Sequence, residues 1–344
     1  MNNNSILTEQ DVINTYDERQ QNHYKLFYNY KKIKQENPTF GYKKISKLMN
    51  EPIHRTRWWH HSKSIPQPIL TANWLKEKEL IPLTADNPKI DLIAKIIGAT
   101  FGDGGIFENL NGIFLSSSEL EAVKEFGEDL NLVFGKEIEE NSRIIEAGVY
   151  GHSWCYQNTN RNIIRFFKAL GAPIGRKSNT ELNIPAWILL ENELADKFLG
   201  SFFGSEINIP KIHINKTHLD TLSIGFTGSQ ELENNRIDFL QKIKHYLGIR
   251  GIETGKICKS KIKRQEDSFI FKLHISIKLE NVIKFREKTK IHYCIYKNKK
   301  LEKTIQDFML LKAIRLNDVK LMGYTEAAAM NLLKINKNIK EMQQ

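Results

Sequence analysis

The sequence has few cysteines and no long apolar run, and each shortage argues against a class of protein. Its 344 residues include three cysteines, Cys155, Cys258 and Cys294, which are widely spaced and form no CxxC pair. This argues against a disulfide framework and against a cysteine zinc site. No run approaches the roughly 18 consecutive apolar residues that a membrane span needs. The first residues, MNNNSILTEQDV, lack a basic-then-apolar signal peptide, so we expect an intracellular protein with no membrane partner.

Basic residues, by contrast, are in excess. The chain has 51 Lys and Arg residues against 40 Asp and Glu, a net charge of +11. Residues 251–303 alone hold 15 basic and six acidic residues. Because this stretch also alternates like a β-strand, we interpret it as a surface for a polyanion rather than as a merely solvated face.

The N-terminal region, residues 1–88, is predicted to be a small helical unit. A helix over Asn22–Glu36 is followed by a short helix from Tyr42 and a second short, basic helix over Ile53–His61. Two short helices joined by a tight turn are typical of a helix-turn-helix, whose second helix lies in the DNA major groove. Arg55 and Arg57 would then bind DNA. The alternative is a plain helical hairpin with a tryptophan in its core.

The rest of the chain is predicted to be a duplicated α+β structure. The segment Ile65–Pro68, followed by Pro82 and Pro88, is interpreted as a linker. Residues 89–192 and 193–320 then repeat one order of elements, helix, strand pair, helix, strand pair and helix. Residues 321–344 form a helical tail.

The two helices that open these repeats share a pattern that points to chemistry. Small residues lie four apart in each, Gly98 with Gly102 and Ser201 with Ser205, a spacing that lets two helices approach closely. Each helix then ends at a carboxylate, Asp103 or Glu206, 103 residues apart. If the helices pack side by side, the two carboxylates meet. Paired carboxylates repel unless a divalent cation such as Mg²⁺ neutralises them, and such a metal can assist phosphodiester hydrolysis.

One strand carries much of the basic surface. Residues Phe269–Leu279 (FIFKLHISIKL) alternate apolar and polar side chains. The polar face of this predicted strand consists of Lys272, His274, Ser276 and Lys278.

Over about residues 90–310, the sequence resembles single-chain, two-motif LAGLIDADG homing endonucleases. The resemblance rests on IIGATFGDGGI, FLGSFFGSE and the LGAPIGRKS…IPAWI run before the second motif. It implies two αββαββα halves related by a pseudo-twofold axis, with the motif helices at the interface and two antiparallel sheets forming a saddle on DNA. It implies a monomer that cuts double-stranded DNA with Mg²⁺, held by Asp103 and Glu206 with the carbonyls of Gly102 and Ser205. The polar face of the basic strand would then face DNA, with Lys272, His274, Ser276 and Lys278 as its contacts.

The sequence departs from that family at several positions. Many relatives carry a lysine near the start of the second strand of each half, where this chain has Ser116–Ser117 and Thr227–Gly228. We predict Lys177 and Lys256 as substitutes for these catalytic lysines. Ile207 stands where glycine is usual, which predicts strain at a helix end that often favours a left-handed residue.

Two other functions fit the same pattern. One is a nuclease-dead intron maturase that binds intron RNA, and the other is a transcription regulator that joins a degenerate core to a helix-turn-helix. An intein is less favoured, because no N-terminal Cys or Ser and no terminal His-Asn is present. A DNA-binding role predicts a cytoplasmic, nucleoid-associated protein.

Overall fold

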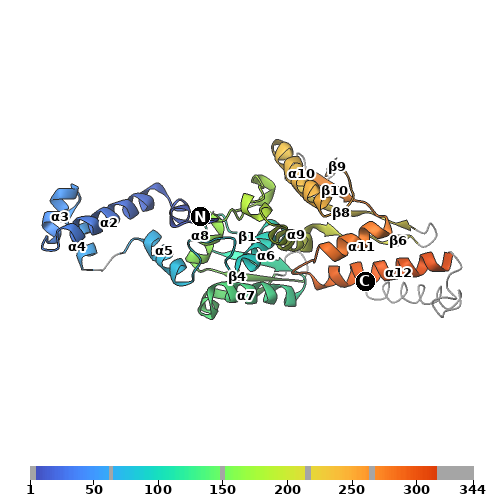
Figure 1. The fold of residues 1–344 in the computed structure, drawn as a ribbon, viewed down its shortest axis with the longest axis horizontal. Helices are drawn as coiled ribbons and strands as arrows, with labels where there is room; N and C mark the ends of the chain where they lie inside the picture. The colour runs from blue at the N-terminus through green and yellow to red at the C-terminus, as the bar shows by residue number, and fades with distance from the viewer. Residues whose placement is uncertain (1–4, 62–64, 148–151, 214–217, 263–267, 316–344) are drawn as a thin grey trace.

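The computed structural model describes residues 5–61, 65–147, 152–213, 218–262 and 268–315. Helices α2 (Glu18–Glu36), α3 (Tyr42–Met49) and α4 (Ile53–His60) lie at one end of an elongated molecule (Figure 1). Helices α6 (Ile90–Phe101) and α9 (Asn192–Glu206) lie near its middle, and α11 (Leu279–Lys288) and α12 (Ile295–Arg315) lie at the other end. The predicted tail, residues 321–344, lies outside the described residues. Within the described ranges, no helix is long and apolar enough to cross a membrane.

Three helices at the N-terminal end surround a small core of their own. They are α2 (Glu18–Glu36), α3 (Tyr42–Met49) and α4 (Ile53–His60). Phe27, Tyr30, Ile45 and Trp59 fill this core, together with Ile69. The short helices α3 and α4 join through Asn50, whose φ of 52° is left-handed. The predicted pair of short helices is therefore present, with Trp59 buried and Trp58 exposed.

The proline-rich stretch read as a linker is instead part of a packed helix. Helix α5 (Gln67–Glu77) begins directly after Pro66 and has Pro68 in its first turn. Proline is tolerated there because the first amides of a helix have no intrahelical partner. Leu75 of α5 is fully buried in the main core, together with residues of α1 (Glu9–Ile13). The linker interpretation was therefore wrong for this segment.

The remaining chain forms two halves of matching architecture, which confirms the predicted duplicated α+β fold. The first half comprises α6 (Ile90–Phe101), β1 (Gly104–Ile106), β2 (Ile113–Ser117), α7 (Leu120–Phe134), η1 (Lys136–Asn141), β3 (Ser142–Ala147), β4 (Ser153–Asn158), α8 (Arg161–Ala169), η2 (Lys177–Asn179) and η3 (Ala186–Leu189). The second comprises α9 (Asn192–Glu206), β5 (Ile207–Asn208), β6 (Ile212–His213), β7 (His218–Leu219), β8 (Leu222–Ser229), η5 (Gln230–Leu232), α10 (Glu233–Ile249), β9 (Thr254–Lys261), β10 (Ser268–Ile275), α11 (Leu279–Lys288) and α12 (Ile295–Arg315).

Each half contains a four-stranded antiparallel sheet with the same strand arrangement. The orders are β1-β2-β4-β3 and β5-β8-β10-β9, and the short strands β6 and β7 form a separate pair. In both sheets, the strand that follows the opening helix lies at one edge. This places the ends of α6 and α9 beside the sheet of their own half.

Strand β10 is shorter than the alternating sequence predicted. It pairs with β8 from Ser268 to Ile275, and its register with β9 shifts between Leu273 and Ile275. Beyond this irregularity the Ser276 amide donates to the Glu253 carbonyl (2.9 Å), and Lys278 is the residue before α11. Ser276 and Lys278 therefore do not continue the polar face of the strand. The alternation is local, whereas the bulge and the start of α11 depend on partners elsewhere in the chain.

Candidate active site

Helices α6 and α9 approach so closely that one of them must carry glycine. A Cβ atom added to Gly98 would lie 2.1 Å from the Phe198 carbonyl oxygen, and one added to Gly102 would lie 2.3 Å from Ser205 Oγ. The Asp103 amide donates to Ser205 Oγ at 2.9 Å, which joins the ends of the two helices. The predicted close packing through Gly98, Gly102 and Ser205 is confirmed. Gly200 and Gly204, by contrast, face residues 290–294 on another side of α9.

The two helices end in different ways, but their ends are joined, so Asp103 and Glu206 lie at the same place. Gly102 ends α6, and Asp103 follows it directly. Glu206 is the last residue of α9, and Ile207 continues into β5 with φ −82° and ψ 136°. This extended backbone suits a β-branched residue, so the predicted left-handed strain at Ile207 was wrong. The chain needs no left-handed residue because helix and strand run on without a turn.

The charge of Asp103 acts on Glu206. Burial and, to a smaller extent, the negative charge of Asp103 together raise the pKa of Glu206 to about 7, against the opposing effects of Lys177 and Lys297. Among the described residues, neither carboxylate has an ion-pair partner within 4.0 Å. Two neighbouring acids without close partners are the arrangement that a divalent cation would stabilise.

Lys177 reaches this centre from the loop that follows α8. Its Nζ donates to the carbonyl oxygens of Thr100 (3.2 Å) and Gly104 (2.5 Å), at the end of α6. Burial lowers the pKa of Lys177 to about 8, while the charges of Glu206 and Asp103 oppose that shift. A cation at a helix C-terminus is favourable because carbonyls without intrahelical partners point there. The structure thus brings Lys177 to the paired acids; its catalytic role stays a prediction.

Lys297, which the sequence did not single out, holds the matching position in the second half. Its Nζ donates to the Ser205 carbonyl at 2.5 Å, beside Glu206. Burial lowers the pKa of Lys297, and the nearby Cys294, Asp103 and Glu206 oppose that shift. Lys177 follows the end of α8 by eight residues, and Lys297 follows the end of α11 by nine. Aligning the two repeats from these helix ends was the signal that could have identified it.

The residues present fit a magnesium ion shared with a phosphate. Among the described residues, no cluster of three or more His, Cys, Asp and Glu could hold a metal. Mg²⁺ nevertheless often binds one or two carboxylates and completes its shell with water and substrate phosphates. Asp103 and Glu206 supply two hard oxygen ligands, and the Gly102 carbonyl is adjacent in sequence. The Ser205 carbonyl is a weaker candidate, because it already accepts from Lys297.

The other residues proposed for catalysis or DNA binding lie outside this centre. Lys256 lies exposed on β9, an edge strand, and it is not among the charges that shift the pKa of Glu206. Lys272 and His274 lie on one face of β10, opposite the buried Phe271 and Leu273. These two residues remain candidates for contact with DNA.

On α4 the two predicted arginines differ. Arg57 is exposed, whereas Arg55 is partly buried and forms an ion pair with Glu51. Arg57 is therefore the more available of the two for a phosphate.

Comparison with known proteins finds relatives that share only a part of their length with this chain. The chain is 30% identical over 217 residues to the DNA-directed RNA polymerase subunit Rpo1N of Methanocaldococcus jannaschii. This match covers 59% of the chain and 16% of the relative. The chain is also 33% identical over 194 residues to the tRNA-splicing ligase RtcB of Pyrococcus abyssi. This match covers 53% of the chain and 20% of the relative. No protein-family model matches the chain.

Among solved structures, the chain is similar to a mesophilic variant of the homing endonuclease I-DmoI. That likeness covers 63% of this chain and all of the neighbour, at 13% identity and a TM-score of 0.41. The assignment of the paired acids and lysines therefore depends on the contacts described above.

Proposed function

We propose that the chain is a site-specific, Mg²⁺-dependent double-strand DNA endonuclease of the homing type that acts as a monomer. The observation that carries this proposal is the pair of carboxylates, Asp103 and Glu206, at the joined ends of two packed helices. Each half also supplies a lysine, Lys177 or Lys297, whose ammonium group donates to a backbone carbonyl beside the end of the motif helix of its own half and is influenced by the charges of both acids.

Each residue of this centre has a distinct role in the proposed reaction. Asp103 and Glu206 would hold Mg²⁺, which supplies charge neutralisation and water activation when bound. Glu206 must lose its proton to bind the metal, and its raised pKa makes that step sensitive to pH near 7. Lys177 and Lys297 would place fixed positive charge where negative charge develops on the phosphate.

The curated relatives also support a self-contained module. The regions matched by Rpo1N and RtcB each cover more than half of this chain, so both include its midpoint. An RNA polymerase subunit and an RNA ligase have different activities, and each match involves a fifth or less of the relative. A stretch common to both is best explained as a module independent of either activity. This favours a mobile-element nuclease over a dedicated transcription regulator.

The proposal is tested by incubating the full chain with Mg²⁺ and a randomised DNA duplex library. Cleaved and merely bound sequences are recovered separately. Enrichment of one family of cleaved sequences, lost on chelation, is the expected result. Sequence-specific binding without cleavage would favour the regulator, and binding of structured RNA in preference to duplex DNA would favour the maturase.

Lys272 provides a test of whether the sheet of the second half contacts DNA. Lys272→Ala is expected to lower affinity for the preferred duplex by about 1–3 kcal/mol with relaxed specificity at one base pair if the lysine reads a base. If it contacts a phosphate, the salt slope should fall by about one for all sequences. The matched control is Lys278→Ala, because Lys278 is off the strand and pairs with Glu253 at 3.0 Å. If Lys272→Ala and the wild type have the same affinity, specificity and salt slope, β10 does not contact DNA.

Arg57 tests the N-terminal helices in the same way. Arg57→Ala is expected to weaken binding to all duplexes and to reduce the salt slope by about one. The variant would make one phosphate contact fewer and so release fewer counterions when it binds DNA. Lys32→Ala is the control, since Lys32 pairs with Glu36 within α2 at 4.0 Å. Affinity is measured at several salt concentrations. An unchanged slope for Arg57→Ala would show that α4 does not contact the phosphates.

A further inference from the structure

Both lysines of the candidate site lie in segments, here called tails, that follow corresponding helices of the two halves, α8 and α11. The first tail, residues 170–190, follows α8 and brings Lys177 to the end of α6. The second tail, residues 289–298, follows α11 and brings Lys297 to the end of α9. Each lysine therefore serves the motif helix of its own half.

The first tail is held by the second half. Arg236, in the first turn of α10, donates from one guanidinium nitrogen to the carbonyls of Lys177 (2.6 Å) and Thr180 (2.8 Å). Asn235 beside it exchanges two hydrogen bonds with the backbone of Leu182 (2.9 and 3.1 Å). The Arg236 side chain is fully buried, so the backbone of Lys177 is held by a residue that cannot readily move.

The second tail is held by the first half. The Glu119 carboxylate, directly before α7, accepts from the amides of Ile295 (3.0 Å) and Tyr296 (3.1 Å) and from Cys294 Sγ (3.2 Å). Ile295 begins α12, so Glu119 satisfies amides that have no partner within their own helix and opposes the positive end of its dipole. Lys297 lies two residues further along this first turn.

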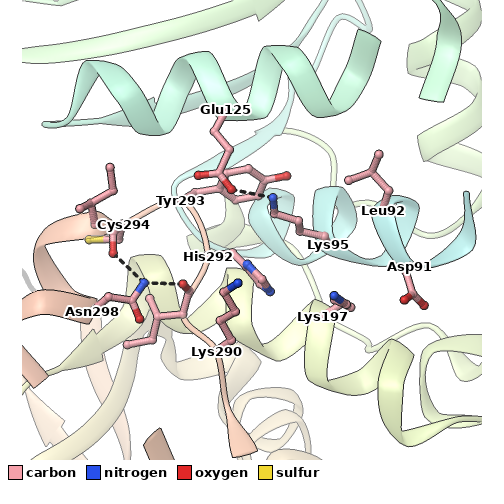
Figure 2. Close-up of a pocket in the computed structure, with 12 residues that line it drawn as sticks. Asp91, Leu92, Lys95, Glu125, Lys197, Lys290, His292, Tyr293, Cys294 and Asn298 are labelled. Atoms are coloured by element: carbon pink, nitrogen blue, oxygen red, sulfur yellow. Dashed lines mark hydrogen bonds and ion pairs between the residues drawn. The ribbon is translucent and has the colours of Figure 1, made fainter. Parts of the chain in front are cut away.

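Further contacts fix the same tail along α6 and α7. The Tyr293 hydroxyl donates to Asp129 at 2.5 Å, and Lys95 of α6 pairs with Asp129 and Glu125 at 2.6 Å each. Figure 2 shows His292, Tyr293, Cys294 and Asn298 of the tail beside α6 and α9, with Lys95 pointing toward Glu125 and Tyr293. The Asn298 side chain donates to the carbonyls of Ile291 (2.6 Å) and Cys294 (3.3 Å), which closes the turn into α12.

We infer that Glu119 and Arg236 are crossed positioning residues, each holding in place the lysine that serves the motif of the opposite half. The two occupy related places, at the start of the helix that follows the second strand of each half's main sheet. Neither motif therefore has its lysine in position unless both halves are packed together. This inference rests on the proposed nuclease function for its catalytic consequence, but the anchoring contacts do not depend on it.

The catalytic consequence is tested by a double-mutant cycle in single-turnover cleavage with saturating protein. Lys297→Met is expected to slow cleavage about 10²-fold, and Glu119→Ala about tenfold, with DNA affinity unchanged. Because Glu119 acts through Lys297, the double variant should be no slower than Lys297→Met alone. When Glu119→Ala is combined with Lys177→Met, the fold reductions in cleavage rate of the two single variants should instead multiply. Multiplicative loss with Lys297→Met, or no loss at all, would overturn the inference.

Glu121→Ala is the matched control, because Glu121 is an exposed acid in the first turn of α7, and within the described part of the chain the hydrogen bonds at the start of α12 go to Glu119 instead. It should cut at the wild-type rate. The reciprocal variant is Arg236→Lys, which keeps a buried cation. Combined with Lys177→Met, it should give cleavage no slower than Lys177→Met alone. If Arg236→Lys does not fold, the Glu119 cycle alone decides the inference.

Hydrogen–deuterium exchange gives a measurement that needs no cleavage. Glu119→Ala should speed exchange at the Ile295 and Tyr296 amides, and Glu121→Ala should not. If the wild-type chain does not cut DNA, the proposed function fails while exchange still reports on the anchor. Unchanged exchange in Glu119→Ala would show that Glu119 does not hold the tail.

Discussion

Glu206→Gln is expected to abolish DNA cleavage, with a loss of about 10³-fold or more, while DNA affinity stays within about tenfold. Affinity is retained because phosphate contacts spread over the protein surface dominate binding. Cleavage is lost because the amide cannot supply the negative charge that holds the metal. Asp103→Asn should behave in the same way. Cleavage and binding are measured separately on the selected duplex, and normal cleavage in either variant would remove that residue from the active site.

The same substitution should stabilise the metal-free protein at high pH. The folded-state pKa of Glu206 is raised from 4.5 to about 7, so its contribution to stability is fully present below 4.5 and is lost as pH rises through 7. Glutamine carries no such penalty. Glu206→Gln should therefore raise the free energy of unfolding by about 1–3 kcal/mol at pH 8 and by far less at pH 5.

Urea unfolding at both pH values, with and without Mg²⁺, measures this effect. Mg²⁺ should stabilise the wild type more at pH 8 than at pH 5, because the metal competes with the proton for Glu206. It should have little effect on Glu206→Gln. Equal stability of the variant and the metal-free wild type at both pH values would contradict the raised pKa of Glu206.

Gly98→Ala is expected to lower the free energy of unfolding by about 3 kcal/mol or more. The added methyl group would lie 2.1 Å from the Phe198 carbonyl oxygen and 2.8 Å from its carbonyl carbon. These are backbone atoms of α9, so no side-chain rotation relieves the clash and the two helices must separate. Because their packing also aligns Asp103 with Glu206, cleavage should fall together with stability.

Gly248→Ala is the control for this substitution. Gly248 is also helical, near the end of α10, but an added Cβ meets no atom within 4 Å. Alanine should there leave stability unchanged or raise it by up to about 1 kcal/mol, since alanine favours helices. Thermal unfolding of both variants checks the difference. A Gly98→Ala protein as stable as Gly248→Ala would mean that α6 and α9 do not pack as closely as described.

The sequence by itself determined the features that depend on neighbouring residues. Small residues at helical spacing predicted the close approach of α6 and α9 because Gly98 and Gly102 have no side chain to keep another backbone away. The acid at the end of each helix then predicted the pairing of Asp103 with Glu206. The repeated order of elements predicted the two halves, since each hydrophobic period specifies one helix or strand locally.

The tertiary structure alone decided the features that depend on distant partners. Strand β10 ends at Ile275, where its register with β9 is irregular and the chain approaches the start of α11 at Leu279, although the alternating sequence continues. Lys297 reaches Ser205, 92 residues away, and Glu119 caps a helix that begins 176 residues later. A charged side chain carries no local pattern that names its partner, because the packing of both halves sets which groups share a buried site. The paired acids could therefore be predicted from the sequence, whereas the crossed anchors that hold the lysines could not.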